Sequence, residues 1–489
     1  RFFYYKNIDI SKLVREETDL KRLLYFVSNS KNKYEELKQM AEGTSYDIRW
    51  YQYSIKELQT DKVEELLRHK ALAAFKKIKR PVIVDHTILE VEAFNNLPGL
   101  QTNYFFEKLG NKEIVDSCNY KKKWKAKAIT KLCCCTGKKL IFAEGMENGR
   151  ITEKADELEG AYAWDSIFKP SENNDKDEIY ARLDKNERSM RRKAWEELTK
   201  QLEKEEILSP DLESYQNNIK DLARLINQKK VMLFIGAGIS ASIGLPSWNS
   251  LIGELGQADD YDPDVFSEYG DNMLLAEYSD GKGGKLQDIF KNKWDINKNP
   301  DLKKHLEESM IYKYIMELDC PVIYTTNYDH MLEEYYKLKK RKLHKIVKLN
   351  HFNSDEHNYP RIMKFHGDTE DMESIVLTES QYFKRMDYQS FMDIQLQADL
   401  LKYTVLFLGY SLADINIKQL LYLSRKRWEN TKLENPSYIY TATPNYVQEE
   451  VFRNNHIVSI SGDEADKKKA TEIFLKDLCE AITKEKKRS

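Results

Sequence analysis

Four short apolar runs in the second half of the chain each end in small or polar residues that could act on a ligand. In chain order, they end at Gly236-Ala237-Gly238-Ile239-Ser240, Thr326-Asn327-Tyr328-Asp329, His366-Gly367-Asp368 and Gly409-Tyr410-Ser411. Open α/β sheets place their chemistry just outside the carboxyl ends of parallel strands. We therefore expect the four ends to meet in one site.

The first of these ends indicates a nucleotide-binding turn. The run Val231–Ile235 is short and continuous, as expected of a parallel strand that is buried on both faces. Gly236 and Gly238 would allow a tight turn and a close approach to a diphosphate, and the small Ala241 would let a helix pack on the strand. Free N–H groups at the start of that helix would hold the negative charge. The pattern alone also fits a plain strand–turn–helix, so the other three ends decide the interpretation.

A doubly wound parallel sheet would bring these ends together. We expect its remaining strands at residues 322–325, 361–365, 404–408, 438–441 and 457–460. The polar stretch 258–310 is helical in character and contains Gly281, Gly283 and Gly284 as a flexible break. We expect this insertion to cap the nucleotide.

As a set, the four ends resemble the sirtuin (SIR2-like) fold over about residues 215–470. The resemblance implies a Rossmann-type domain that binds NAD. It implies the following roles: Gly236, Ala237, Gly238, Ser240 and Thr326 around the NAD diphosphate and ribose, Asn327 and Asp329 at the nicotinamide ribose, His366 as catalytic base, and Gly409 and Ser411 at a ribose or phosphate. Cleavage of the nicotinamide–ribose bond needs a base and an amide that positions water, and His366 and Asn327 fit those two roles.

Two departures favour water as the acceptor. Protein deacylase sirtuins carry two Cys-x-x-Cys pairs that hold a structural zinc ion, and this sequence contains no such pair. Thr326 stands where those enzymes have glutamine. Both features resemble the bacterial SIR2-like proteins of anti-phage defence, which hydrolyse NAD. We therefore expect NAD as the substrate and no zinc.

The first half of the chain begins with a candidate phosphate site. A predicted strand, residues 23–27, is followed by the polar turn Ser28–Lys33 and a helix. Backbone N–H groups and a lysine in such a turn can hold a phosphate, although a plain surface turn is an equal alternative.

Further motifs make this half resemble the Ham1 family of inosine triphosphate pyrophosphatases over about residues 22–200. They are residues 26–36, Val82-Ile83-Val84-Asp85-His86-Thr87, Leu97-Pro98-Gly99, Trp164-Asp165-Ser166-Ile167-Phe168 and Ser189-Met190-Arg191. The resemblance implies these roles: Ser28, Lys33, Lys185, Ser189 and Arg191 on the triphosphate and base edge, Tyr162, Trp164 and Asp165 in the base pocket, Lys70 toward the phosphates, and Glu57 with Asp85 as carboxylates for Mg²⁺. A triphosphate suits Lys, Arg and Mg²⁺, and a purine suits an aromatic face.

This half also departs from its family. Asp85 is followed by His86 where the family carries paired acids, the second being the catalytic aspartate, and imidazole is a poor Mg²⁺ ligand. Ser30 and Met190 replace a family asparagine and histidine. We expect this domain to bind a purine nucleoside triphosphate and to cleave it slowly or not at all, while Asp85 leaves residual pyrophosphatase activity open.

Length and composition support a protein of two domains without a nucleic-acid footprint. The chain has 489 residues and a net charge of −2, with 32% charged residues. Its six cysteines, three of them the run 133–135, fit reduced structural thiols. It shows neither a long apolar run nor a signal peptide, so we expect a cytoplasmic protein without a membrane partner.

We expect a Ham1-like domain over residues 1–205, a charged helical linker over 206–229 and a SIR2-like domain over 230–489. The leading hypothesis is a homo-oligomeric sensor and effector, in which inosine or deoxyinosine triphosphate binds the first domain and licenses NAD hydrolysis by the second. Two alternatives stay open: a nucleotide-pool pyrophosphatase with an accessory NAD-binding domain, and a binding module in which neither site turns over.

Overall fold

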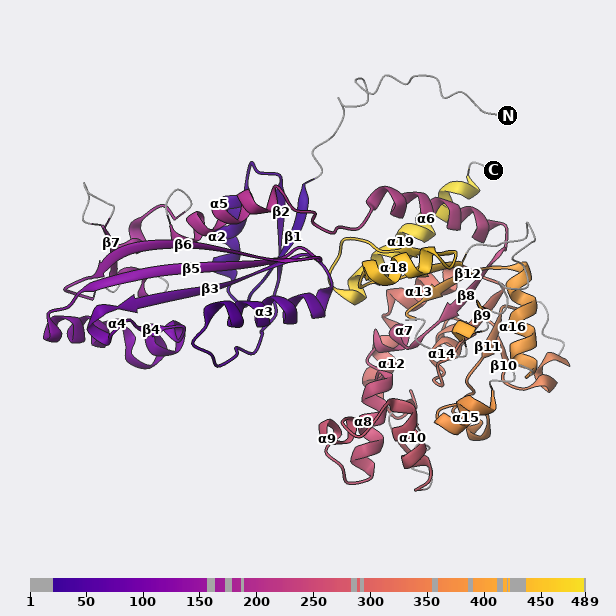
Figure 1. The fold of residues 1–489 in the computed structure, drawn as a ribbon. Helices are drawn as coiled ribbons and strands as arrows, with labels where there is room; N and C mark the ends of the chain where they lie inside the picture. The colour runs from indigo at the N-terminus through magenta and orange to yellow at the C-terminus, as the bar shows by residue number, and fades with distance from the viewer. Residues whose placement is uncertain are drawn as a thin grey trace, which may run out of the picture. The chain divides into compact units, whose positions relative to one another are not determined.

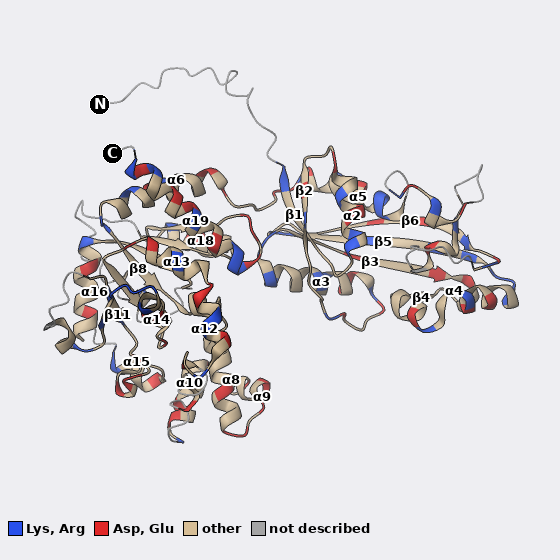
Figure 2. Ribbon diagram, turned by 180° about the vertical axis from the view of Figure 1, so that it is seen from behind, with Lys and Arg blue, Asp and Glu red and all other residues tan. Residues whose placement is uncertain are grey.

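The computed structural model divides the chain into two compact units, residues 1–209 and 210–489 (Figure 1). It describes residues 21–155, 163–171, 178–185, 189–282, 288–290, 294–353, 359–385, 390–410, 417–419, 421–422 and 437–487. Within these residues, no helix is both long and apolar enough to cross a membrane. Lys and Arg are interspersed with Asp and Glu on the ribbon of each unit (Figure 2).

The first unit is built on a mixed sheet in the order β2-β1-β3-β5-β6-β7, with β4 paired to β3. Its strands are β1 (Arg22–Val27), β2 (Tyr46–Tyr51), β3 (Val82–Val91), β4 (Leu97–Gly99), β5 (Lys125–Cys135), β6 (Leu140–Ile151) and β7 (Phe168–Pro170). Strand β1 runs parallel to β2 and β3, and the remaining pairs are antiparallel. A hairpin at Thr136-Gly137 joins β5 to β6, and β3 continues through Asp85 and His86 to Val91.

Helices cover both faces of this sheet (Figure 1). They are α2 (Lys31–Ala41), α3 (Val63–Ile78), α4 (Thr102–Lys121) and α5 (Met190–Leu202), with 3-10 turns η1 (Glu92–Phe94), η2 (Ala163–Ser166) and η3 (Tyr180–Arg182). Ser30 and Ser189 cap α2 and α5 with their hydroxyl oxygens. Because Ser189 is the cap, α5 begins at Met190, and Lys185 precedes the helix.

The second unit contains the expected parallel sheet, in the order β10-β11-β9-β8-β12-β13-β14. Its strands are β8 (Val231–Ile235), β9 (Val322–Thr325), β10 (His344–Ile346), β11 (Arg361–Lys364), β12 (Thr404–Leu408), β13 (Ser437–Tyr440) and β14 (Ile457–Ile460), all paired in parallel. The chain adds strands on one side of β8 and then crosses to the other, so β8 lies at the point where the strand order reverses. The four strands with the polar ends, β11, β9, β8 and β12, are neighbours.

Helices pack on both faces of this sheet, as expected of a doubly wound fold. The helices of the second unit are α6 (Leu212–Asn227), α7 (Ala237–Ala241), α8 (Trp248–Ala258), α9 (Pro263–Ser267), α10 (Asn272–Asp280), α12 (Pro300–Glu307), α13 (Met310–Glu317), α14 (Met331–Leu338), α15 (Glu379–Lys384), α16 (Phe391–Lys402), α18 (Tyr446–Arg453) and α19 (Lys467–Lys486), with 3-10 turns η5 (Leu349–Asn353) and η6 (Met372–Ser374). Alternate residues of β8 enter the two core clusters, Val231, Leu233 and Ile235 on one face and Met232 and Phe234 on the other.

The expected linker at 206–229 requires correction. Helix α6 lies inside that range, and its residues Tyr215, Ile219 and Leu222 are buried in a core cluster of the second unit. The Tyr215 hydroxyl donates to Asp477 on α19 at 2.9 Å. The charged residues that suggested a linker cover one face of α6, whereas its apolar face packs into the core. The two units therefore divide between Ser209 and Pro210.

Three glycines let two backbone segments cross at the head of β8. A Cβ atom at Gly236 or Gly238 would lie 2.5 or 2.9 Å from the carbonyl oxygen of Gly409, and one at Gly409 would lie 2.6 Å from the nitrogen of Ile239. Gly409 also has a φ of +62°, which favours glycine. These positions thus require glycine because the end of β12 packs directly against the backbone of the β8–α7 turn.

We predict that Gly409→Ala lowers the free energy of unfolding of the second unit by about 1–3 kcal/mol, because the methyl group adds a backbone clash to a strained φ. Urea denaturation followed by circular dichroism would measure this. Gly253→Ala is the matched control: Gly253 is inside α8, and a Cβ there would meet only Pro263 at 3.4 Å. The control should be neutral or slightly stabilising. Equal stability of the two variants would contradict the prediction.

Candidate functional site

A cavity of about 680 Å³ lies at the carboxyl ends of the central strands of the second unit. It is lined by Ala237, Gly238, Ser240, Leu245, Pro246, Ser247, Trp248, Asn249, Leu251, Asp271, Asn272, Met273, Trp294, Thr326, Asn327, Tyr328, Asp329, His366, Tyr382, Gly409 and Tyr410. The list contains eight of the predicted site residues: Ala237, Gly238, Ser240, Thr326, Asn327, Asp329, His366 and Gly409. Gly236 lies one residue before the lining, and Ser411 falls outside the described residues. The structure thus brings the four polar strand ends together.

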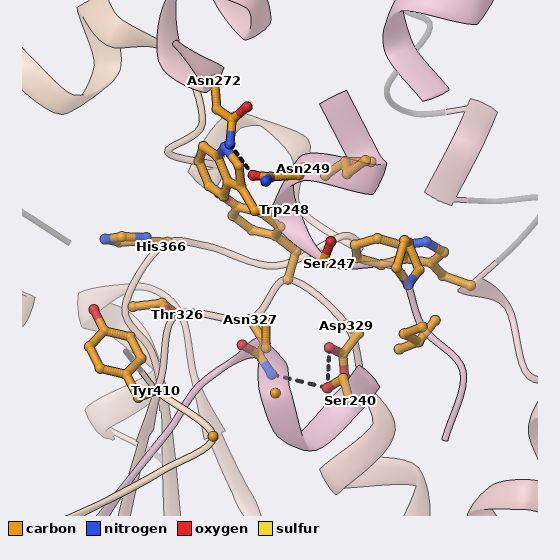
Figure 3. A pocket seen from close by; sticks show the side chains of 18 of the residues that line it. Ser240, Ser247, Trp248, Asn249, Asn272, Thr326, Asn327, Asp329, His366 and Tyr410 are labelled. Atoms are coloured by element: carbon orange, nitrogen blue, oxygen red, sulfur yellow. Dashed lines mark hydrogen bonds between the residues drawn. The ribbon is translucent and has the colours of Figure 1, made fainter. Parts of the chain in front are cut away.

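A chain of hydrogen bonds joins Asn327, Ser240 and Asp329 on the wall of this cavity (Figure 3). The Ser240 hydroxyl donates to Asp329 Oδ2 at 2.8 Å, and Asn327 Nδ2 donates to the same hydroxyl at 3.0 Å. The three side chains are at most 9% exposed. Thr325 Oγ1 accepts from the N–H of Asn327 at 3.0 Å, which fixes the start of the loop.

These hydrogen bonds determine which end of the Asn327 amide faces the cavity. A carboxylate only accepts hydrogen bonds, so Ser240 must give its single proton to Asp329. The Ser240 oxygen is then an acceptor, which also accepts from the Tyr312 hydroxyl at 3.4 Å, and of the two ends of the Asn327 amide only the NH₂ group can donate to it. In Figure 3 the amide oxygen of Asn327 accordingly points away from Ser240, toward the side of the cavity where Thr326 and His366 lie. An oxygen held in this way can accept a hydrogen bond from a bound water or hydroxyl.

His366 is held at the opposite side of the cavity by helix α15. Its ring is 2% exposed, and the Tyr382 hydroxyl lies 3.4 Å from Nδ1. The two rings meet edge to face at 5.3 Å. Arg385, at the end of α15, donates a hydrogen bond to the carbonyl of Phe365 and lies over its ring. Helix α15 therefore fixes both the imidazole and the backbone that carries it.

The glycine turn differs in one respect from the expectation. The N–H of Gly238, predicted to be open to a diphosphate, donates to the Gly409 carbonyl at 2.9 Å. This bond is made because the turn crosses β12 at close range. Within the described residues of the turn, the hydroxyl of Ser240 is also engaged, so a diphosphate would have to be held by other lining groups or after a local adjustment.

Helix α8 and the insertion that follows it supply a wall of the cavity that the sequence patterns did not reveal. Trp248 and Asn249 come from the start of α8, and Asn272 from the start of α10. Asn272 Nδ2 donates to Asn249 Oδ1 at 2.6 Å, beside the Trp248 ring (Figure 3). Asn272 belongs to the stretch 258–310 that we expect to cap the nucleotide, whereas Trp248 and Asn249 precede that stretch, and the capping role stays a prediction. Trp248 follows the glycine turn closely in the sequence, and this proximity was the available signal that it could line the cavity.

The first unit gathers the predicted sensor residues into a dense set of ion pairs. Four basic side chains, Lys33, Lys70, Lys185 and Arg191, contact four acidic ones, Glu36, Glu57, Asp85 and Asp165. Residues from α2, α3, β3, η2 and α5 thus meet at one place. A triphosphate that binds here would have to compete with carboxylates for the same lysine and arginine groups.

Asp85 is the most enclosed member of this cluster. Its Oδ2 lies 2.6 Å from Nη1 of Arg191 and 3.1 Å from Nζ of Lys33, and the residue is 3% exposed. Burial alone would raise the pKa of Asp85, but Lys33 and Arg191 together hold it well below its usual value. Arg191 also donates to Glu36 at 2.9 Å. Asp85 therefore serves as an anion that orders two of the predicted phosphate-binding cations.

His86 and Glu57 lie next to Lys70. The Lys70 ammonium donates to Glu57 at 3.1 Å and to the main-chain carbonyl of Asp85 at 2.9 Å. His86 Nε2 lies 3.0 Å from the Leu100 carbonyl, which only accepts, so this nitrogen carries a proton. Burial, and then the charge of Lys70, lower the pKa of His86, so the ring is neutral near pH 7.

This donor set does not suit Mg²⁺ in the described conformation. Glu57 pairs with Lys70, and Asp85 pairs with Lys33 and Arg191, so neither carboxylate is open to the ion. The neighbouring His86 offers a nitrogen rather than the oxygen that Mg²⁺ prefers. The metal role of Glu57 and Asp85 stays a prediction that requires these pairs to open.

The remaining sensor residues are placed as follows. Trp164 is 4% exposed and stacks on Tyr180 at 5.9 Å, so a base-stacking role would require that face to be uncovered. Asp165 pairs with Lys185. The Ser189 hydroxyl accepts from the N–H of Arg192, and Ser28 Oγ from the N–H of Ser30. Tyr162 lies outside the described residues, and its base-pocket role stays a prediction.

Comparisons with known proteins match the two units to different families. The Ham1 family model matches residues 24–201, and the SIR2-like domain model matches residues 321–460. The second match begins after the glycine turn and therefore does not include Gly236 or Ser240. These two residues are assigned to the site because β8 lies between β9 and β12 in the sheet. All six cysteines are free thiols, with 133–135 buried in β5.

The similar proteins include NAD hydrolases, which match the second unit, and pyrophosphatases, which match the first. "NAD(+) hydrolase ThsA" of Enterococcus faecium is 31% identical over 227 residues, 45% of this chain and 45% of that protein, so the chain spans less than half of that relative. An "Inosine triphosphate pyrophosphatase" of Scheffersomyces stipitis is 32% identical over 171 residues, 33% of this chain and 86% of that protein. The solved structure of the Staphylococcus aureus Ham1 protein is 22% identical, with a TM-score of 0.32, and covers 37% of this chain and 98% of that chain.

We predict that Asp85→Asn lowers the stability of the first unit at pH 7 by about 3 kcal/mol, because it removes the buried anion of Lys33 and leaves Arg191 with Glu36 alone. The pKa of Asp85 is lowered in the folded state, so its contribution is full above the unfolded pKa of about 3.9 and is lost as the pH falls below it. The variant should lose that part of the acid dependence in urea titrations. Asp47→Asn, which removes an exposed pair with Arg49, should cost less than about 1 kcal/mol. Equal effects of the two substitutions would refute the assignment.

Proposed function

Because the chain belongs to the Ham1 family through residues 24–201 and carries a SIR2-like domain over residues 321–460, we propose that it is an NAD hydrolase gated by a purine nucleoside triphosphate. In this proposal the second unit releases nicotinamide from NAD, and the first unit binds inosine or deoxyinosine triphosphate. NAD loss would then act in anti-phage defence. The name of the ThsA relative supports the hydrolase activity, and the pyrophosphatase name supports the nucleotide class.

The observation that carries the proposal is the meeting of Asn327 and His366 in one cavity at the reversal of the strand order. Both side chains are fixed before a ligand arrives, Asn327 by Ser240 and His366 by Tyr382. Sites that are ordered in advance lower a reaction barrier without a reorganisation cost during the reaction.

The proposed reaction breaks the bond between the ribose carbon and the nicotinamide nitrogen. The electron pair of that bond passes to the pyridinium ring, which leaves as neutral nicotinamide. Water adds to the sugar carbon, its proton passes to His366, and the other product is ADP-ribose. The Asn327 amide oxygen would accept a hydrogen bond from the water and orient its attack.

The first unit is proposed to bind the triphosphate more strongly than it cleaves it. Neutral His86 stands beside Asp85 where a second carboxylate would be needed, and Asp85 itself is occupied by Lys33 and Arg191. Such binding can license the second unit only if the nucleotide binds the active state more tightly than the inactive one. Mg²⁺ would enter with the triphosphate, and assembly into a homo-oligomer is a further part of the proposal.

The pyrophosphatase alternative is retained because the relatives of the first unit carry that name. It would need Asp85 to leave its two cations and to act on water near the phosphates. Pyrophosphate release from inosine triphosphate that disappears in Asp85→Ala would favour this reading over the sensor.

We predict that the full chain releases nicotinamide from NAD, and that inosine or deoxyinosine triphosphate raises the rate about tenfold or more over ATP or no nucleotide. Chromatography would measure nicotinamide and ADP-ribose. His366→Ala and Asn327→Ala should each lower the rate about 100-fold or more, because they remove the base or the water-orienting amide. Activity that is unchanged across the whole nucleotide panel, or that persists in both variants, would contradict the proposal.

We also predict that Ser240→Ala lowers kcat about 10- to 100-fold, because the Asn327 amide loses the acceptor that orients it. Ser242→Ala is the control in the same helix region. The Ser242 hydroxyl donates to the main-chain carbonyl of Ile239 at 2.6 Å and does not line the cavity. The control should stay within about twofold of the unsubstituted protein. A Ser240→Ala variant with full activity would show that the amide is oriented by other means.

A further inference from the structure

A buried lysine lies behind the cavity, between the loops that carry the two proposed catalytic residues. Lys364 is the last residue of β11 and precedes His366 by two positions. The residue is 1% exposed, which is unusual for lysine, and it does not line the cavity. The proposed chemistry gives it no direct role, so its burial calls for another explanation.

Three oxygen atoms surround the Lys364 ammonium. It donates a hydrogen bond to the main-chain carbonyl of Asp329, and it lies 3.4 Å from Glu333 Oε1 and 3.5 Å from Asp368 Oδ2. The bond to Asp329 is a hydrogen bond, whereas Glu333 and Asp368 balance the charge of the ammonium group as ion-pair partners. Asp329 belongs to the loop after β9, whereas Asp368 belongs to the loop after β11. Lys364 therefore contacts both loops, on the side away from the cavity.

The same two loops are joined again by a histidine and an aspartate. His330 Nε2 lies 2.6 Å from Asp368 Oδ1. Burial would raise the pKa of Asp368, but the His330 hydrogen bond and the Lys364 charge hold it well below its usual value. Lys345 approaches this cluster from its exposed side, at 3.5 Å from Asp368 and 2.6 Å from Glu370.

These contacts bear on the distance between the water-orienting amide and the base. The backbone ladder between β9 and β11 continues to the bond from the N–H of Phe365 to the Thr325 carbonyl, at 2.8 Å. Beyond it, Asn327 and His366 lie on separate loops. The Lys364 bond reaches the main chain two residues after Asn327, from a residue two positions before His366, so it constrains both loops at once.

We propose that Lys364 is a positioning residue for NAD hydrolysis, which fixes the loop of Asn327 and Asp329 against the strand that presents His366. The inference rests on the proposed function of the cavity. Lys364 does not touch the substrate in this account. Its loss should therefore change the rate of the chemical step far more than the affinity for NAD.

The first test replaces the ammonium by an apolar chain of similar length. Lys364→Met should lower kcat for nicotinamide release about 100-fold with KM for NAD changed less than about threefold, since small displacements of reacting groups cost this much. Lys345→Met is the matched control: the side chain belongs to the same charge cluster but is 27% exposed and contacts only carboxylates there. It should keep kcat within about twofold. Assays would use the full chain with the activating nucleotide.

Two further variants keep the inference testable if Lys364→Met does not fold. Lys364→Arg retains a donor for the Asp329 carbonyl and should recover at least about a tenth of the normal kcat. Asp368→Asn removes one anion beside Lys364 and should lower kcat about tenfold at unchanged KM. A folded Lys364→Met protein with normal kcat, or a loss that lies entirely in KM, would overturn the inference. An unsubstituted chain that never hydrolyses NAD would instead overturn the proposed function itself.

Discussion

The hydrogen bond from Ser240 to Asp329 is the interaction on which the proposed site depends. It commits the only proton of the serine, and this leaves the serine oxygen as an acceptor for the Asn327 amide. The amide oxygen is thereby turned toward the cavity. The three residues come from α7 and from the loop after β9, so the arrangement exists only because the parallel sheet places those two strand ends side by side.

The first unit depends on a different constraint, which is the balance of buried charge. Asp85 and its partners neutralise one another without a ligand, and the neutral ring of His86 adds no charge. A triphosphate with four negative charges would change that balance by replacing carboxylates as the partners of Lys33 and Arg191. Such an exchange of partners is a physical means by which nucleotide binding could favour a second state of the protein.

The sequence predicted the parts of the fold that local patterns determine. The parallel sheet and the four strand ends follow from apolar runs and turn residues, and eight predicted residues line one cavity. Tyr382 and Asn272 were missed because nothing near them in the sequence indicates the tertiary packing that brings α15 and α10 to the site. The exposed charges of α6 predict a linker, whereas its apolar face packs into the core of the second unit. The burial of Trp164 depends on Tyr180, which no periodicity places against it.

The central claim is that water is the acceptor of the ADP-ribosyl group and that the bound nucleotide licenses this hydrolysis. The most direct measurement is mass spectrometry of the products formed from NAD by the full chain in ¹⁸O-labelled water, with and without deoxyinosine triphosphate. The account predicts free nicotinamide together with ADP-ribose that carries one ¹⁸O atom, formed mainly when the nucleotide is present. Nicotinamide release without labelled ADP-ribose would contradict hydrolysis, and equal labelling without the nucleotide would contradict the gate.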